Sequence, residues 1–221
     1  MIRSIIYCCR PMLLLPMILL VLPGCQAAYF NTMEKFGYHK RDILVSRVEE
    51  ARDAQHEAKD QFRSALERFT TVTGFKGGSL EEQYNQLNSE YLSSKAKSDA
   101  VSSRIASVED VAEALFEEWE EELDQYRSDS LRRSSRQKLD QTRGRYRQLI
   151  AAMKKAEAKI APVLSAFNDQ VLFLKHNLNA QAIASLRNEL ASVETDINAL
   201  IREMESSIRE ADAFISAMAS E

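Results

Sequence analysis

Cysteine and histidine, the side chains that most often carry metal or nucleophilic chemistry, are scarce in this chain of 221 residues. The three histidines, His39, His56 and His176, lie far apart, and no His-x3-His, Glu-x-x-His or paired-cysteine spacing of a zinc site occurs. The sequence also lacks the G-x-S-x-G turn of hydrolases and the glycine-rich loops of nucleotide-binding proteins. We therefore predict no catalytic residue, no metal ligand and no cofactor site, which favours a non-enzymatic protein.

Cys25 is the residue whose surroundings indicate a specific reaction. It follows an uncharged apolar stretch, residues 11–22, which is too short to span a bilayer of about 30 Å but has the length of a signal-peptide core. The run Leu22-Pro23-Gly24-Cys25 resembles the bacterial lipobox. This resemblance implies cleavage before Cys25 and acylation, by palmitate or similar chains, of its thiol and new amino terminus. The alternative is a plain secretory signal with an incidental cysteine.

The other cysteines support the acylation of Cys25. Cys8 and Cys9 would leave with the signal peptide, so the mature chain would hold a single thiol and no internal disulfide. The next residue, Gln26, resembles the sorting residue of outer-membrane rather than inner-membrane lipoproteins. The sequence thus predicts a membrane partner through lipidated Cys25, with the protein on the outer membrane facing the periplasm. The expected organisation is a signal peptide, a lipidated tether and one helical domain, at residues 1–24, 25–30 and 31–221.

The charge of the mature chain is mildly acidic. Removing residues 1–24 takes away two of the 29 basic side chains and none of the 33 acidic ones, which changes the formal net charge from −4 to −6. This balance argues against a nucleic-acid partner and against wide electrostatic adhesion to anionic lipid.

Glycine and proline, which are frequent at the turns of folds with many short elements, are rare beyond Cys25. Three of the four prolines and one of the six glycines precede Cys25, so only Pro162 and five glycines remain. This scarcity excludes a β-sandwich, a β-barrel and a disordered linker, and predicts a few long helices.

Apolar residues recur in steps of three and four along four segments, the pattern of a coiled-coil seam. Ser79 and Glu82 form a capping box at the start of the second segment. Gln55 is a polar residue at an otherwise apolar position of the first segment. Pro162 should kink the third segment without ending it. The predicted helices cover residues 31–73, 79–127, 131–177 and 180–218. We expect an all-α fold: an elongated, antiparallel four-helix bundle, about 60–75 Å long, after a cleaved lipoprotein signal peptide. The alternative is that the chain runs through residues 177–179 as one very long helix.

The distal tip of such a bundle, far from Cys25, is the best candidate for a contact surface. Residues 171–174 are four consecutive apolar residues, and a helix buries only one stripe, so Leu172 or Phe173 must face outward or toward a partner. The alternative is that Phe173 covers the end of the bundle over the glycine turn. The candidate partner contacts are Phe75, Lys76, Leu172, Phe173, Lys175 and His176.

The opposite end combines an acidic run, residues 117–124, with a basic one, residues 132–147. An antiparallel turn between them should bring Glu122 opposite Arg136. One interpretation is a pH-sensitive binding site that uses His39. The other is a set of solvated ion pairs that fixes the helix register.

Three strings resemble an uncharacterised family of bacterial lipoproteins, catalogued as domain of unknown function 2959. They are residues 34–45 (EKFGYHKRDILV), 115–120 (LFEEWE) and 173–180 (FLKHNLNA). The resemblance covers nearly all of the mature chain. It implies a helical, lipid-anchored envelope protein and supplies no catalytic residues.

These features predict a lipid-anchored periplasmic scaffold, spacer or adaptor that binds an envelope protein partner or a second copy of itself. Two alternatives are a periplasmic chaperone or lipid-binding module that opens between helices, and an enzyme. The heptads also resemble the coiled-coil arms of DNA-repair ATPases, but the missing phosphate loop and the lipobox argue against that interpretation.

Overall fold

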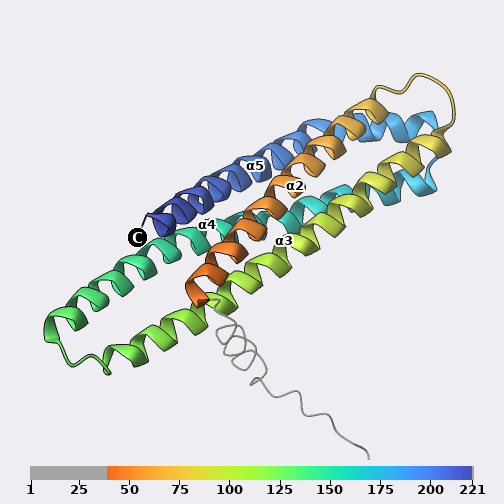
Figure 1. The fold of residues 1–221 in the computed structure, drawn as a ribbon. Coiled ribbons are helices and arrows are strands. Elements are labelled where there is room, and N and C mark those ends of the chain that lie inside the picture. The colour runs from red at the N-terminus through yellow and green to blue at the C-terminus, as the bar shows by residue number, and fades with distance from the viewer. Residues whose placement is uncertain (1–38, 221) are drawn as a thin grey trace, which may run out of the picture.

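The computed structural model describes residues 39–220 and shows four long helices with short connections (Figure 1). The helices are α2 (Lys40–Thr73), α3 (Leu80–Leu123), α4 (Asp129–His176) and α5 (Ala180–Ala219). Within residues 39–220 there is no strand. The all-α prediction is confirmed, and so is the turn at residues 177–179. The predicted signal peptide, the tether, and residues 31–38 of the first predicted helix lie outside the described residues.

The four helices form a closed ring in which each packs against two neighbours. The packed pairs are α2 with α3, α3 with α4, α4 with α5, and α5 with α2. We call the end that holds residues 74–79 and 177–179 the tip, and the end that holds Lys40, residues 124–128 and Ala219 the base. The longest helix, α4, has 48 residues and spans about 72 Å. At the base, the α3–α4 hairpin projects beyond the start of α2 and the end of α5 (Figure 1).

The heptad residues of all four helices meet in one continuous core. Phe62, Phe69 and Phe167 are fully buried, and the Phe167 ring meets Phe69 and Tyr91 edge-on, with centroids 6.4 and 6.1 Å apart. These contacts join α2, α3 and α4 near the tip. Each helix therefore buries the single apolar stripe that it could not leave in water.

The helix starts are set by short polar side chains that accept otherwise unpaired backbone N–H groups. The Ser79 hydroxyl accepts from the Glu82 N–H at 3.2 Å, and the Asn179 carboxamide oxygen accepts from the Ala182 N–H at 3.0 Å. At the tip loop, Gly78 has φ of +122°, a conformation that side chains with a Cβ rarely adopt.

The structure differs from the predicted helices at three places. The second helix ends at Leu123 rather than residue 127, and the next begins at Asp129 rather than 131, because Ser128 takes an extended backbone and its hydroxyl accepts from the Leu131 N–H at 3.4 Å. Similarly, His39 is extended, so the first described helix begins at Lys40. The helix α4 does continue through Pro162, which lies on the exposed side.

Candidate functional site

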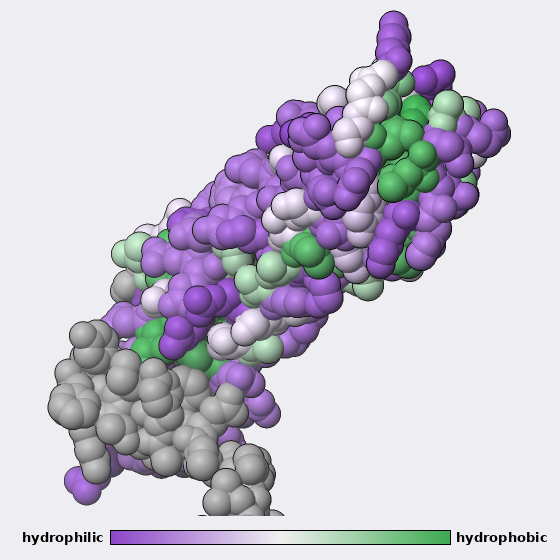
Figure 2. Space-filling model, turned by 90° about the vertical axis from the view of Figure 1, so that its right-hand side faces the viewer, coloured by the Kyte–Doolittle hydropathy of each residue, from purple (hydrophilic) through white to green (hydrophobic). Residues whose placement is uncertain are grey.

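The tip carries three large apolar side chains that the bundle leaves in solvent. Leu172, Phe173 and Leu178 are 44, 40 and 44 % exposed, whereas their neighbours Val171 and Leu174 are buried. Figure 2 looks toward this end of the molecule and shows apolar side chains gathered there among hydrophilic ones. Both Leu172 and Phe173 thus face outward, because the core takes only the 171 and 174 positions of this turn.

A hollow of about 330 Å³ lies at the same end of the bundle, between the loop at residues 74–79 and the start of α5. Phe75 and Lys76 line it from the loop, and Ile183 and Arg187 line it from α5. Phe75 is half-buried, and its ring lies against the Gly78 position, where an added Cβ would come within 3.4 Å of it. The loop is therefore packed on its own aromatic side chain.

The predicted contact residues fall into two groups. Phe75 and Lys76 line the hollow, whereas Leu172, Phe173, Lys175 and His176 belong to the end of α4 and do not line it. Lys76, Lys175 and His176 are all exposed. The structure therefore places all six residues at the tip, on two adjoining surfaces rather than in one pocket.

Arg187 is a residue of the tip that the sequence did not single out. Its Nε and Nη2 atoms donate to the Thr73 carbonyl oxygen at 3.2 and 2.9 Å. This carbonyl belongs to the last turn of α2, where a cation is favoured by the helix dipole. The contact joins the first and last described helices, and the heptad pattern alone does not reveal which residue makes it.

The charge of the tip differs from that of the chain as a whole. Residues 70–80 and 170–188 contain no Asp or Glu, but they contain Lys76, Lys175, Arg187 and His176. The first acidic side chains beyond the loop, Glu81 and Glu82, lie in the first turn of α3, and Asp169 and Glu189 lie further down the helices. Basic side chains thus lie near the exposed apolar residues, and Glu81 and Glu82 at the start of α3 bring acidic side chains to the same end.

The base is held by ion pairs and hydrogen bonds between neighbouring helices. Lys40 is 6 % exposed and its Nζ lies 2.7 Å from a Glu118 carboxylate oxygen. Across the α3–α4 hairpin, Arg143 contacts Glu120 at 2.5 Å, and Trp119 Nε1 donates to the Ser135 hydroxyl at 2.9 Å. The predicted pairing of the acidic helix with the basic one is confirmed.

The residues that pair at the base differ in part from those predicted. Arg136 lies 3.8 Å from Glu120 rather than beside Glu122, and Glu118 pairs with α2. The hydrogen bond from Arg143 lowers the pKa of Glu120, and the same bond raises the pKa of Arg143. His39 lines a hollow of about 460 Å³ together with Lys40, Glu118 and Trp119, among others.

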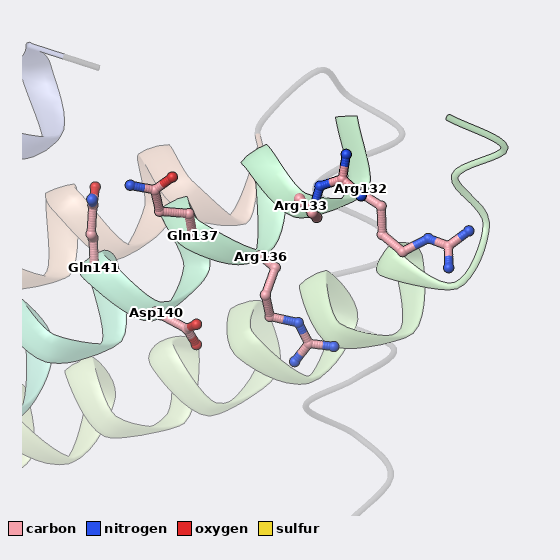
Figure 3. Close-up of a pocket in the computed structure, with 6 residues that line it drawn as sticks. All are labelled: Arg132, Arg133, Arg136, Gln137, Asp140 and Gln141. Atoms are coloured by element: carbon pink, nitrogen blue, oxygen red, sulfur yellow. The ribbon is translucent and has the colours of Figure 1, made fainter. Parts of the chain in front are cut away.

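A second hollow at the base, of about 600 Å³, is lined by α4 residues that include Arg132, Arg133 and Arg136. Figure 3 shows their guanidinium groups pointing in different directions rather than toward a common point. Arg132 donates to the Tyr126 carbonyl oxygen at 3.0 Å, and Arg136 faces Glu120. These contacts join α3 to α4 in the hairpin, and the three guanidinium groups do not converge to bind an anion.

Residues 39–220 hold no cluster of three or more His, Cys, Asp or Glu side chains placed to bind a metal ion. None of their helices contains an apolar stretch sufficient to cross a membrane.

The fold and the tip define a class of protein: an elongated, antiparallel four-helix bundle with exposed apolar side chains at one end. The chain belongs to the family described as "Protein of unknown function (DUF2959)", whose family profile matches residues 29–218. A comparison with curated proteins gave no match.

Proposed function

We propose that this protein is a lipid-anchored, non-enzymatic scaffold, spacer or adaptor of the cell envelope. In this proposal the acyl chains on Cys25 hold the chain in the outer membrane, and the bundle extends into the periplasm. Lys40, the first residue of the described helices, lies at the base, while the exposed apolar side chains lie at the tip. This separation of about 50 Å along α2 is the observation that carries the proposal. It would present a contact surface at a distance from the anchor.

The core gives less support to the alternative of a chaperone or lipid-binding module that opens between helices. That function would be favoured by an apolar space along the seam at Ser94 and Ser98. Both serines are buried, and the Ser98 hydroxyl donates to the Ser94 carbonyl oxygen at 2.7 Å within α3. The neighbouring layers are filled by Phe62 and Val101, which are fully buried.

The lipid anchor is tested by following the processing of the full chain in a Gram-negative host. We expect Cys25→Ser, or treatment with globomycin, to leave an unprocessed precursor. Cys8→Ser, a matched change inside the predicted signal peptide, should leave processing unchanged. Normal processing in the presence of globomycin would contradict the proposal that the protein is a lipoprotein.

The sorting role of Gln26 has its own test, because it depends on the residue after the acylated cysteine. Gln26→Asp should move the mature protein from the outer to the inner membrane fraction on a sucrose gradient. Gln26→Asn is the matched control and should leave the protein in the outer membrane. An unchanged distribution for Gln26→Asp would contradict the sorting proposal.

The contact role of the tip is tested by photo-crosslinking in cells. A photo-reactive residue at position 173 should capture an envelope component, whereas one at position 92, where Leu92 is exposed about three turns into α3, should not. Equal capture from both positions, or none from position 173, would contradict the adaptor proposal.

A further inference from the structure

We infer that the tip binds the surface of a bilayer that contains anionic phospholipid, with Phe173 and its apolar neighbours entering the headgroup region and Lys76 and Lys175 contacting lipid phosphates. This inference deepens the tip contact of the proposed function by naming its partner. It does not depend on acylation of Cys25.

The first argument is the chemistry of the exposed side chains. Leu172, Phe173 and Leu178 are each about two-fifths exposed although they are large and apolar, and they stand together at the end of α4 and in the turn that follows it. Scattered apolar side chains are normal on a protein surface, but a group at one end of a rod indicates a contact site. Aliphatic and aromatic side chains at such an edge suit the boundary between headgroups and acyl chains.

The second argument is charge complementarity. The chain as a whole is acidic, with a formal net charge of −4, yet the two tip segments, residues 70–80 and 170–188, hold only basic charged side chains. Lys175 is exposed close to Phe173 at the end of α4, and Lys76 is exposed in the loop between α2 and α3. A bilayer that contains anionic lipid attracts each such lysine. Glu81 and Glu82, exposed in the first turn of α3, are repelled, so the attraction acts through the end of α4 and the loop at residues 74–79.

The third argument is shape. The tip is the narrow end of a bundle (Figure 1), and its exposed apolar residues lie near the end of α4 and in the turn at residues 177–179. A stable protein interface normally takes about 800 Å² from each partner, which calls for a broad face. Insertion of a few side chains into a bilayer needs no such area, since each buried apolar group contributes by itself. An end-on contact with a lipid surface therefore fits this geometry better than a protein does.

Vesicle flotation tests this inference. The mature chain, residues 25–221 with Cys25→Ser, contains the whole bundle and has no acyl group. We expect it to float with phosphatidylcholine vesicles that contain phosphatidylglycerol, to bind pure phosphatidylcholine vesicles less, and to lose binding at high salt. The double variant Phe173→Ser/Lys175→Glu should bind at least roughly tenfold more weakly, because it removes an inserted ring and reverses a charge.

The base offers a matched control. Leu131 is 59 % exposed and Arg133 is exposed, so Leu131→Ser/Arg133→Glu makes the same chemical change at the other end of the bundle. This variant should bind like the parent. Equal loss in both variants, no loss in the tip variant, or no binding by the parent would each overturn the inference. Equal binding to vesicles with and without phosphatidylglycerol would overturn its anionic part.

A second measurement covers the case in which the tip variant does not fold. In a Trp119→Phe background, which removes the only tryptophan, Phe173→Trp places a reporter at the tip. Its emission should shift to the blue on adding phosphatidylglycerol vesicles, and an unchanged spectrum would overturn the inference. These outcomes are independent of the globomycin test, so failure of one proposal can be distinguished from failure of the other.

Discussion

At the scale of single residues, Gln55 is the least expected member of the core. It is fully buried in α2, and neither its amide nitrogen nor its carbonyl oxygen has a hydrogen-bond partner among residues 39–220. A buried polar group without a partner costs about 1–3 kcal/mol. The heptad pattern located this residue correctly, since its position in the seam follows from spacing alone.

Replacing Gln55 by leucine should therefore stabilise the bundle. We expect Gln55→Leu to raise the free energy of unfolding by about 1–2 kcal/mol, because the side chain keeps its approximate volume and loses its unpaired polar atoms. Gln55→Ala, the control, also removes the polar atoms but leaves a cavity, and it should gain less or destabilise. Urea unfolding measures both, and a less stable Gln55→Leu would show that this amide has a stabilising role.

Tyr146 lies where α4 packs against the acidic half of α3. Its ring meets Phe116 at 5.4 Å between centroids. Burial, with added repulsion from Glu109, Glu113 and Asp110, raises the pKa of the Tyr146 hydroxyl to about 12. The sequence did not reveal this environment, because it depends on which turn of α3 faces which turn of α4.

This pKa predicts how stability changes at high pH. Unfolded tyrosine loses its proton near pH 10, whereas Tyr146 in the bundle keeps it to about pH 12. Between these values the folded state binds more protons, so the free energy of unfolding falls as pH rises. The free energy of unfolding of the Tyr146→Phe variant, measured with urea, should fall less steeply over this pH range. Identical slopes for the variant and the parent would contradict the raised pKa.

At the scale of helices, the sequence predicted four helices and their order, but it misplaced the boundary between α3 and α4. The five residues 124–128 contain neither glycine nor proline, so their composition does not distinguish a turn from a helix. The boundary is decided by Ser128, whose cap at the start of α4 competes with continuing α3. The turns at residues 74–79 and 177–179 were predicted correctly. Glycines mark the first, whereas the second contains neither glycine nor proline and is set by the Asn179 cap.

Arg143 makes three contacts that hold α3 to α4 near the base. It pairs with Glu120, donates to the Phe116 carbonyl oxygen at 3.2 Å, and lies 5.2 Å from the centre of the Phe116 ring. Its side chain is 28 % exposed, compared with 52 % for Arg136, which only faces Glu120 at 3.8 Å. The two arginines therefore offer a matched comparison on one helix.

We expect Arg143→Ala to lower the free energy of unfolding by about 1–2 kcal/mol, because it loses a hydrogen bond, a cation–π contact and an ion pair together. Arg136→Ala should change it by less than about 0.5 kcal/mol, as exposed ion pairs contribute little. Chemical denaturation of both variants checks this order. Equal effects would mean that the hairpin is held by its apolar contacts alone.

At the scale of the whole molecule, every helix runs most of the length of the rod, so no boundary divides the tip from the base. The sequence predicted this closed bundle from the single apolar stripe of each helix. It could not supply the contacts that close the ring, such as Arg187 on the Thr73 carbonyl oxygen. Those depend on α2 and α5 lying side by side, which is a property of the assembled bundle.

A destabilising substitution at the tip should therefore also lower the stability of the base. Gly78→Ala forces a side chain into a backbone with positive φ and should destabilise the bundle by about 1–2 kcal/mol. Gly77→Ala, where an added Cβ meets nothing within 4 Å, should have little effect. For Gly78→Ala, the unfolding midpoints from circular dichroism and from Trp119 fluorescence at the base should move together. A shift in circular dichroism alone would show that the tip unfolds separately.

The seam between α2 and α5 has a consequence for how the chain reaches this fold. Three of the four seams join helices that are connected by short turns, so each pair can begin to pack at its turn and continue along its length. The fourth joins the first described helix to the last, through contacts such as Arg52 with Asp212, 160 positions apart. Such distant contacts carry the largest loop-closure cost unless the hairpins between them have formed first. Closure of α2 against α5 is therefore the late event in folding, and this seam is where two half-formed chains could exchange helices.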